Sequence, residues 1–121
     1  LVRDKTEASF TPLGLRTQPT ILTKEHFQQA LLAKMGEEGM EVAAATDREN
    51  LIEELADVQE LMLAMYTAFA ITPEEVEQYR RRKAAERGSF QGGHFLGEVD
   101  VEPGSAADMY LSKNGFEQIS E

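Results

Sequence analysis

The 121-residue chain contains no cysteine, and this absence sets the first limits on its chemistry. Disulfides, thiolate metal sites and thiol nucleophiles are excluded, and the absence is compatible with a reducing compartment. No apolar run approaches the roughly 20 residues that a membrane-spanning helix needs. The N-terminal residues also lack the basic, apolar and small-residue pattern of a signal peptide. We therefore expect a cytoplasmic protein with no membrane partner.

Basic residues are scarce as well, because 12 lysines and arginines stand against 22 aspartates and glutamates, for a formal net charge of −10. A protein that binds a nucleic-acid polymer would carry a basic field instead. A small nucleotide is not excluded, because a bound cation can reverse the local charge. The hydrophobic fraction of 41% is typical of a globular chain, and the length suits one ordinary domain.

Helical periodicity predicts three helices in the interior of the chain. The first, Thr23–Ala45, begins at a threonine N-cap, and the second, Asp47–Ala70, begins at an aspartate N-cap. The third starts at the capping box Thr72–Glu75 and ends at Gly88. The apolar stripe of the second helix is too wide for one neighbour, which favours a bundle or a dimer interface. These features predict an all-α fold with a helical hairpin core, in a four-helix-bundle-like and oligomeric arrangement.

The remaining segments are less regular. Residues 1–20 are expected to form a short extended piece followed by a loop, and residues 95–101 a short strand. Residues 106–121 carry no pattern that places them. Gly36 and Gly39 lie inside the first helix, where each costs about 1 kcal/mol relative to alanine, so we expect another backbone to approach closely there.

Four acidic residues lie on the apolar stripes of the first two helices rather than opposite them: Glu38, Glu41, Glu54 and Asp57. Within each helix, a spacing of three residues places two carboxylates one turn apart on one face. An ionised carboxylate removed from water is costly unless a partner compensates it. A divalent cation compensates all four, and Mg2+ or Mn2+ prefers oxygen ligands. Acidic pairs at this spacing are also common on solvated helix faces, so the spacing alone leaves that alternative open.

Three parts of the chain, in the same order, resemble a known family. Residues 37–41 and 54–57 resemble the E-E-x-x-E and E-x-x-D signature of the all-α nucleotide pyrophosphohydrolases, which include the MazG type, the dimeric dUTPases and phosphoribosyl-ATP pyrophosphohydrolase. Leu1–Lys5 resembles the L-V-R-D-K opening of a small phosphoribosyl-ATP-pyrophosphohydrolase-like branch, and Lys83–Phe90 resembles its K-x-x-E-R-G-x-F end. The resemblance implies an all-α nucleotide pyrophosphohydrolase domain over residues 1–96. Residues 97–121 are then a C-terminal extension of unknown role.

The resemblance also implies a set of site residues. The residues that match the Mg2+ ligands, with Mn2+ as an alternative ion, are Glu38, Glu41, Glu54 and Asp57. Glu37 and Glu38 are the candidate catalytic residues that orient or deprotonate the attacking water, and Glu37 is alternatively a metal ligand or a solvated surface residue. Position and charge add the candidate substrate-binding residues: Lys34 lies one turn before Glu38 on the same side of the helix, and the chain ends, if they fold near the metal, bring Arg3, Lys5, Lys83 and Arg87. The resemblance adds support for Lys83 and Arg87. Lys34 alternatively pairs with the glutamates that follow it.

The implied activity is the Mg2+-dependent cleavage of a nucleoside triphosphate, or a related nucleotide, into a nucleoside monophosphate and pyrophosphate. The wide apolar stripe and the basic chain ends favour a homodimer or homotetramer in which a second subunit completes the site. Spacing does not decide the base or sugar, and a role in the histidine pathway stays open within this class. The alternative from another class is a non-catalytic helical oligomer that uses the acidic cluster for a structural cation or for partner binding.

Overall fold

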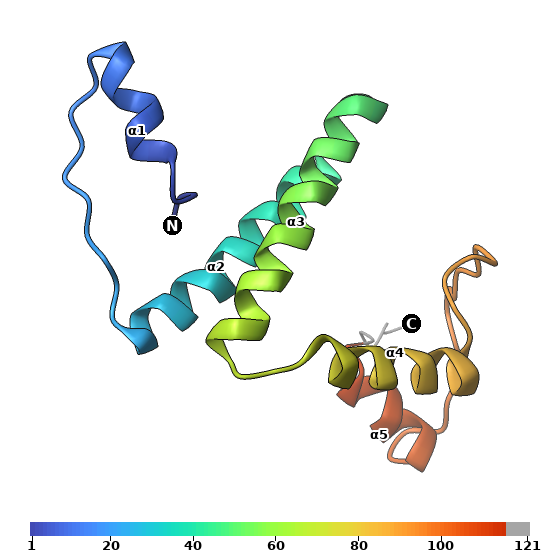
Figure 1. Ribbon diagram of the computed structural model, residues 1–121. Coiled ribbons are helices and arrows are strands. Elements are labelled where there is room, and N and C mark those ends of the chain that lie inside the picture. The colour runs from blue at the N-terminus through green and yellow to red at the C-terminus, as the bar shows by residue number, and fades with distance from the viewer. Residues whose placement is uncertain (116–121) are drawn as a thin grey trace. The chain divides into compact units, whose positions relative to one another are not determined.

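The computed structural model describes residues 1–115 and is helical, with no strand among those residues (Figure 1). In chain order the elements are α1 (Thr6–Phe10), the 3-10 helix η1 (Thr11–Leu13), α2 (Lys24–Ala43), α3 (Arg48–Ala68), α4 (Pro73–Arg87) and α5 (Ala106–Lys113). The predicted all-α class is therefore confirmed.

The starts of the three interior helices follow from their capping residues. The Thr23 hydroxyl and the Asp47 carboxylate each accept a hydrogen bond from the backbone N–H three residues later, at 3.4 and 2.8 Å. Thr72 and Glu75 exchange hydrogen bonds between side chain and backbone at 3.2 and 2.8 Å, which completes the predicted capping box. Gly88 follows α4 with a φ of +81°, a conformation that glycine adopts without strain. These predicted helix boundaries are confirmed.

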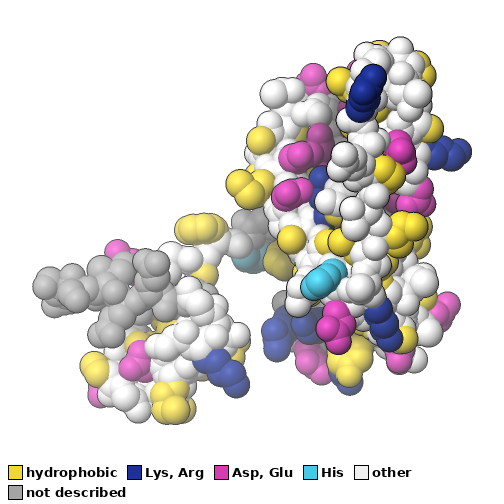
Figure 2. Space-filling model, turned by 90° about the vertical axis from the view of Figure 1, so that its left-hand side faces the viewer, with side chains coloured by type: hydrophobic (Ala, Val, Ile, Leu, Met, Phe, Trp, Pro, Cys, Tyr) yellow, Lys and Arg dark blue, Asp and Glu magenta, His cyan; other side chains and the backbone are white. Residues whose placement is uncertain are grey.

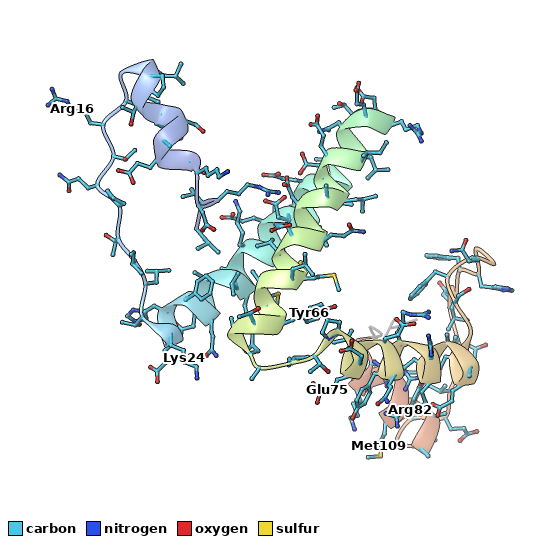
Figure 3. The ribbon with its side chains drawn as sticks, in the orientation of Figure 1. Arg16, Lys24, Tyr66, Glu75, Arg82 and Met109 are labelled. Carbon is cyan, nitrogen blue, oxygen red and sulfur yellow. The ribbon has the colours of Figure 1, made fainter. Side chains whose placement is uncertain are left out.

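The two long helices α2 and α3 pack against each other as the expected hairpin. The connection between Ala43 and Arg48 is short, so the two helices run antiparallel. The side-chain amide of Gln28 near the start of α2 donates a hydrogen bond of 2.8 Å to the carbonyl of Ala68 at the end of α3. In Figure 3, Lys24 and Tyr66 mark these two ends, which lie at the same end of the hairpin.

Within residues 1–115, the hairpin buries only two side chains fully. Leu31 is 1% exposed and Glu38 is 5% exposed, both on α2. Large apolar side chains of α3 that remain more than one-third exposed are Leu51, Ile52, Leu55, Met62 and Leu63. Figure 2 shows hydrophobic side chains scattered over the face of the molecule that it draws. The apolar stripe of α3 therefore stays partly open in the single chain.

Two local expectations are wrong. The predicted extended piece at the N-terminus is helical over residues 6–13, because Pro12 suits the first turn of η1 and Gly14, at φ +75°, ends it. Residues 95–101 form no strand, since the described part of the chain offers no second strand for pairing. The close approach expected at Gly36 and Gly39 is not made by this chain, because outside the helix's own nearby backbone no atom lies within 4 Å of a Cβ built on either glycine.

The chain divides into two compact units, Leu1–Glu86 and Arg87–Glu121, of which residues 116–121 lie outside the described range. In the second unit, α5 begins at Ser105, whose hydroxyl accepts from the backbone N–H of Asp108 at 3.1 Å. The domain limits of 1–96 and 97–121 stay a prediction. Over the described residues, every helix is too short or too polar to traverse a bilayer.

Candidate metal centre

Three of the four predicted carboxylates meet between α2 and α3. Glu38 and Glu41 come from α2 and Glu54 from α3, and one carboxylate oxygen of each lies within 4.8 Å of the others. In Figure 3, side chains with oxygen ends project from both helices. Glu38 is buried, Glu54 is half-buried and Glu41 is exposed, so the cluster reaches from the hairpin interior to the surface. A small ligand therefore has access from the Glu41 side.

Glu38 is held by a lysine one turn earlier on the same helix. The Lys34 ammonium lies 3.5 Å from Oε1 of Glu38 and 3.0 Å from the carboxylate of Glu37. Hydrogen bonding to Glu37, followed by the charges of Glu37 and Glu38, raises the pKa of Lys34 above its ordinary value despite partial desolvation. Oε2 of Glu38 is buried and has no hydrogen-bond partner in the described chain.

Glu54 has a similar arrangement with a neutral partner. The side-chain amide of Asn50, one turn earlier on α3, donates to Oε1 of Glu54 at 3.2 Å. Oε2 of Glu54 is buried without a partner, as in Glu38. Hydrogen bonding with Glu54, and then repulsion by its charge, raises the pKa of the neighbouring Glu41.

The donor set fits a hard divalent cation. Buried polar atoms almost always have a partner, and an unsatisfied charged oxygen is especially costly. Here two such oxygens occur in one cluster with a third carboxylate, and all candidate ligands are oxygens. Oxygen-only sets of this kind suit hard divalent cations, among them Mg2+, Mn2+ and Ca2+. The residues present thus meet the requirements of such an ion.

Asp57, the fourth predicted ligand, has a different partner. Its Oδ1 lies 2.5 Å from the guanidinium of Arg3, from the segment that precedes α1. The Asp57 hydrogen bond and charge raise the pKa of Arg3, and the charges of Glu60 and Glu38 add to this shift. Arg3 is therefore close enough to the cluster for the Glu38 charge to raise its pKa. Asp57 is outside the group of three glutamates whose oxygens approach one another.

The other predicted residues occupy varied positions. Glu37 is exposed and pairs with Lys34, so pairing is the arrangement that Lys34 adopts in this structure. Lys5 and Lys83 are exposed and form no ion pair within residues 1–115. Arg87 belongs to the second compact unit. Among the substrate-binding candidates, the structure places Lys34 and Arg3 beside the carboxylates.

Sequence reasoning missed Asn50. Its signal was available, because Asn50 precedes Glu54 by four residues just as Lys34 precedes Glu38. The spacing rule for ion pairs along a helix applies only to charged neighbours, so it predicts Lys34 as a partner of Glu38 but not Asn50 as a partner of Glu54.

The fold and the carboxylate cluster define the class: an all-α protein with a candidate divalent-cation site between the helices of a hairpin. The family model for phosphoribosyl-ATP pyrophosphohydrolase matches residues 13–84, more than half of the chain, and the chain belongs to this family. The match spans both long helices and most of α4. The comparisons with curated proteins and with solved structures found no match. The family description indicates a pyrophosphohydrolase, and the resemblance to this superfamily is confirmed.

Proposed function

We propose that the protein is a Mg2+-dependent nucleotide pyrophosphohydrolase, with Mn2+ as an alternative ion. The observation that carries this proposal is the pair of buried, unpartnered carboxylate oxygens on Glu38 and Glu54. They occur in a chain of the phosphoribosyl-ATP pyrophosphohydrolase family, at positions that resemble the superfamily's acidic signature. Proposed ligands are Glu38, Glu41, Glu54 and Asp57.

The proposed reaction hydrolyses the bond between the α- and β-phosphates. The water oxygen forms a bond to the α-phosphorus while the bond from that phosphorus to the bridging oxygen breaks. The products are a nucleoside monophosphate and pyrophosphate, and the water proton passes to a carboxylate oxygen of Glu37 or Glu38. A divalent cation bound at the cluster supplies Lewis acidity toward the phosphates and favours deprotonation of water.

Basic side chains are proposed to bind the phosphates. Lys34 and Arg3 lie beside the carboxylates and are positioned to neutralise charge on the departing pyrophosphate. For Arg3 this role requires exchange of Asp57 for a phosphate oxygen. Lys5, Lys83 and Arg87 are exposed and complete the proposed set.

The protein is further proposed to act as a homodimer or homotetramer. The supporting observation is the apolar stripe of α3, which the single chain leaves partly exposed. A second helical pair against this stripe would complete a four-helix arrangement and remove the apolar surface from water. Sedimentation measurements on the purified protein test this proposal, and a monomer at micromolar concentration contradicts it.

Release of pyrophosphate from a substrate panel tests the activity. The panel contains phosphoribosyl-ATP and the common ribo- and deoxyribonucleoside triphosphates, each with and without Mg2+. We expect release from at least one substrate, dependence on Mg2+ and loss after chelation. No release from any substrate by a folded, Mg2+-loaded protein contradicts the proposal.

The alternative is a non-catalytic helical oligomer with a structural cation. The observation that favours it is that the two basic side chains beside the cluster are already paired with carboxylates, Lys34 with Glu38 and Arg3 with Asp57, rather than left for a phosphate. Titration calorimetry with Mg2+, with and without a non-hydrolysable nucleotide, distinguishes the two. A higher Mg2+ affinity in the presence of the nucleotide supports the enzyme. An Mg2+ affinity that is the same with and without the nucleotide supports the structural cation.

A further inference from the structure

The two buried glutamates are held in the same way from two different helices. In each, Oε1 contacts a side chain four residues earlier, which is Lys34 for Glu38 and Asn50 for Glu54. In each, Oε2 is buried and without a partner. The residue at the earlier turn thus decides which oxygen is occupied and which is left available. On α2 this residue carries a charge, whereas on α3 it is neutral.

Asn50 is itself fixed at the start of α3. Its backbone N–H donates to Oδ1 of the N-cap Asp47 at 2.8 Å. Its side-chain Oδ1 accepts from the backbone N–H of Thr46 at 3.2 Å, and its Nδ2 donates to Glu54 at 3.2 Å. The Thr46 N–H requires an acceptor and the Glu54 carboxylate requires a donor. These two groups together determine which way the Asn50 amide is oriented.

The chemistry of this position favours asparagine over the usual capping residue. Three residues after an N-cap, glutamate commonly reaches back to a backbone N–H, as Glu75 does toward Thr72 in α4. A glutamate at position 50 would place a third negative charge against Glu54. An amide performs the capping with its oxygen and donates to Glu54 with its nitrogen. It therefore anchors the carboxylate without removing the charge that a cation requires.

We infer that Asn50 is a positioning residue of the cation site: by holding Oε1 of Glu54 to the first turn of α3, it leaves Oε2 as the oxygen that binds. This inference rests on the proposed function, since it assumes that Glu54 is a ligand. Removal of a residue that hydrogen-bonds to a metal-ligating side chain commonly lowers the metal affinity by about 10- to 100-fold. Asn50 contacts neither water nor substrate in this role and acts only through Glu54.

Calorimetric titration of the metal-free protein with Mg2+ and with Mn2+ tests the inference without measuring hydrolysis. Asn50→Ala removes the amide and is expected to weaken binding by about 10- to 100-fold. Asn50→Gln restores a donor that can reach one turn along the helix, and is expected to recover most of the lost affinity. The width of the electron paramagnetic resonance signal of bound Mn2+ reports any change in ligand geometry.

Asp47→Ala is the matched control. It removes the N-cap from the same helical turn but leaves the Asn50 side chain in contact with Glu54, so it lowers the melting temperature with little effect on affinity. If Asn50→Ala does not fold, Asn50→Ser replaces it, because serine keeps a polar side chain in the first turn of the helix but is too short to reach Glu54. Wild-type affinity in the alanine or serine variant, or an equal loss in Asp47→Ala, overturns the inference alone. Failure of the wild-type protein to bind either ion overturns the proposed function as well.

Discussion

Carboxylates on α4 and in the hairpin share helical spacing but have opposite surroundings. On α4, Glu77 lies 2.6 Å from Arg80 and 3.1 Å from Arg81, and these partners lower its pKa to about 2. In the hairpin, Glu41 faces Glu54, and this neighbour raises the pKa of Glu41. One carboxylate is stabilised in its charged form and the other is destabilised.

The difference identifies where the chain needs an external cation. On α4, arginines lie three and four residues after the glutamate. They neutralise its charge from within the same helix. In the hairpin, Lys34 serves Glu38, but Glu41 and Glu54 receive no cationic side chain in an ion pair among the described residues. The four experiments that follow test this contrast, from the largest expected effect to the smallest.

Glu54→Gln is expected to have the largest effect. Glutamine keeps the size of the side chain but removes the charge of a proposed ligand. We expect Mg2+ affinity to fall by at least about 100-fold, since loss of a ligand should exceed loss of its outer partner, and pyrophosphate release to fall with it. Calorimetry and the release assay measure both. Glu77→Gln is the control from α4, and equal losses in the two variants would break the comparison.

Lys34→Met tests the charged half of the site. Methionine retains most of the apolar stem but leaves the buried Glu38 without its cationic partner. We expect the metal-free protein to lose about 1–3 kcal/mol of unfolding free energy. Urea denaturation without Mg2+ measures this loss, and saturating Mg2+ should reduce it. A loss that is the same with and without Mg2+ contradicts a shared compensation of Glu38.

Glu41→Gln separates stability from binding. Because the folded state raises the pKa of Glu41, its charged form opposes folding at neutral pH when no cation is present. The variant is therefore expected to melt at a higher temperature than the metal-free wild type, yet to bind Mg2+ more weakly. Thermal melts with a chelator and with excess Mg2+ measure the two effects. A lower melting temperature under chelation would show that Glu41 and Glu54 do not repel each other.

Glu77→Gln is expected to have a small, pH-dependent effect on stability. The folded-state pKa of about 2 lies below the ordinary value of 4.5, so the charged form favours folding. This contribution is complete above pH 4.5 and disappears as the pH falls toward 2. Melting curves of wild type and variant should therefore differ slightly at neutral pH and converge in acid. Because the group is exposed, high salt should shrink the difference, and a difference that grows in acid contradicts the assignment.

Local signals in the sequence predicted the helices well. Thr23, Asp47 and Thr72 each cap a helix, because the side chain accepts a hydrogen bond from the backbone N–H three residues later. Such contacts depend on nearby residues alone. The same signal at Ser105 and Asp108 was overlooked, and α5 begins there. The prediction of an extended N-terminal piece was wrong because proline and glycine occur at the ends of short helices as well as in loops.

The site was only partly readable from the sequence. Helical spacing predicted that Glu38, Glu41, Glu54 and Asp57 lie on the inward-facing stripes of the two helices. The structure brings the three glutamates together, but Glu38 is buried, Glu54 half-buried and Glu41 exposed, and Asp57 is outside the group. Helical spacing could not predict the Arg3–Asp57 pair, which joins residues 54 positions apart and depends on the course of the whole intervening chain. Whether these residues bind a metal stays a prediction. The open faces of Gly36 and Gly39 likewise depend on neighbours that spacing does not specify.

The Arg3–Asp57 pair has a consequence for the behaviour of the N-terminal segment. If Asp57 binds a cation, the guanidinium and that cation are competing ligands of one carboxylate. Reciprocity then requires that each weakens the apparent affinity of the other by the same factor. The pair is largely open to water, at 63% and 36% side-chain exposure, so salt weakens it further. The attachment of the first residues to α3 should therefore loosen with rising ionic strength and with rising divalent-cation concentration. The two dependences should differ, because salt screens the ion pair whereas the divalent cation competes for Asp57.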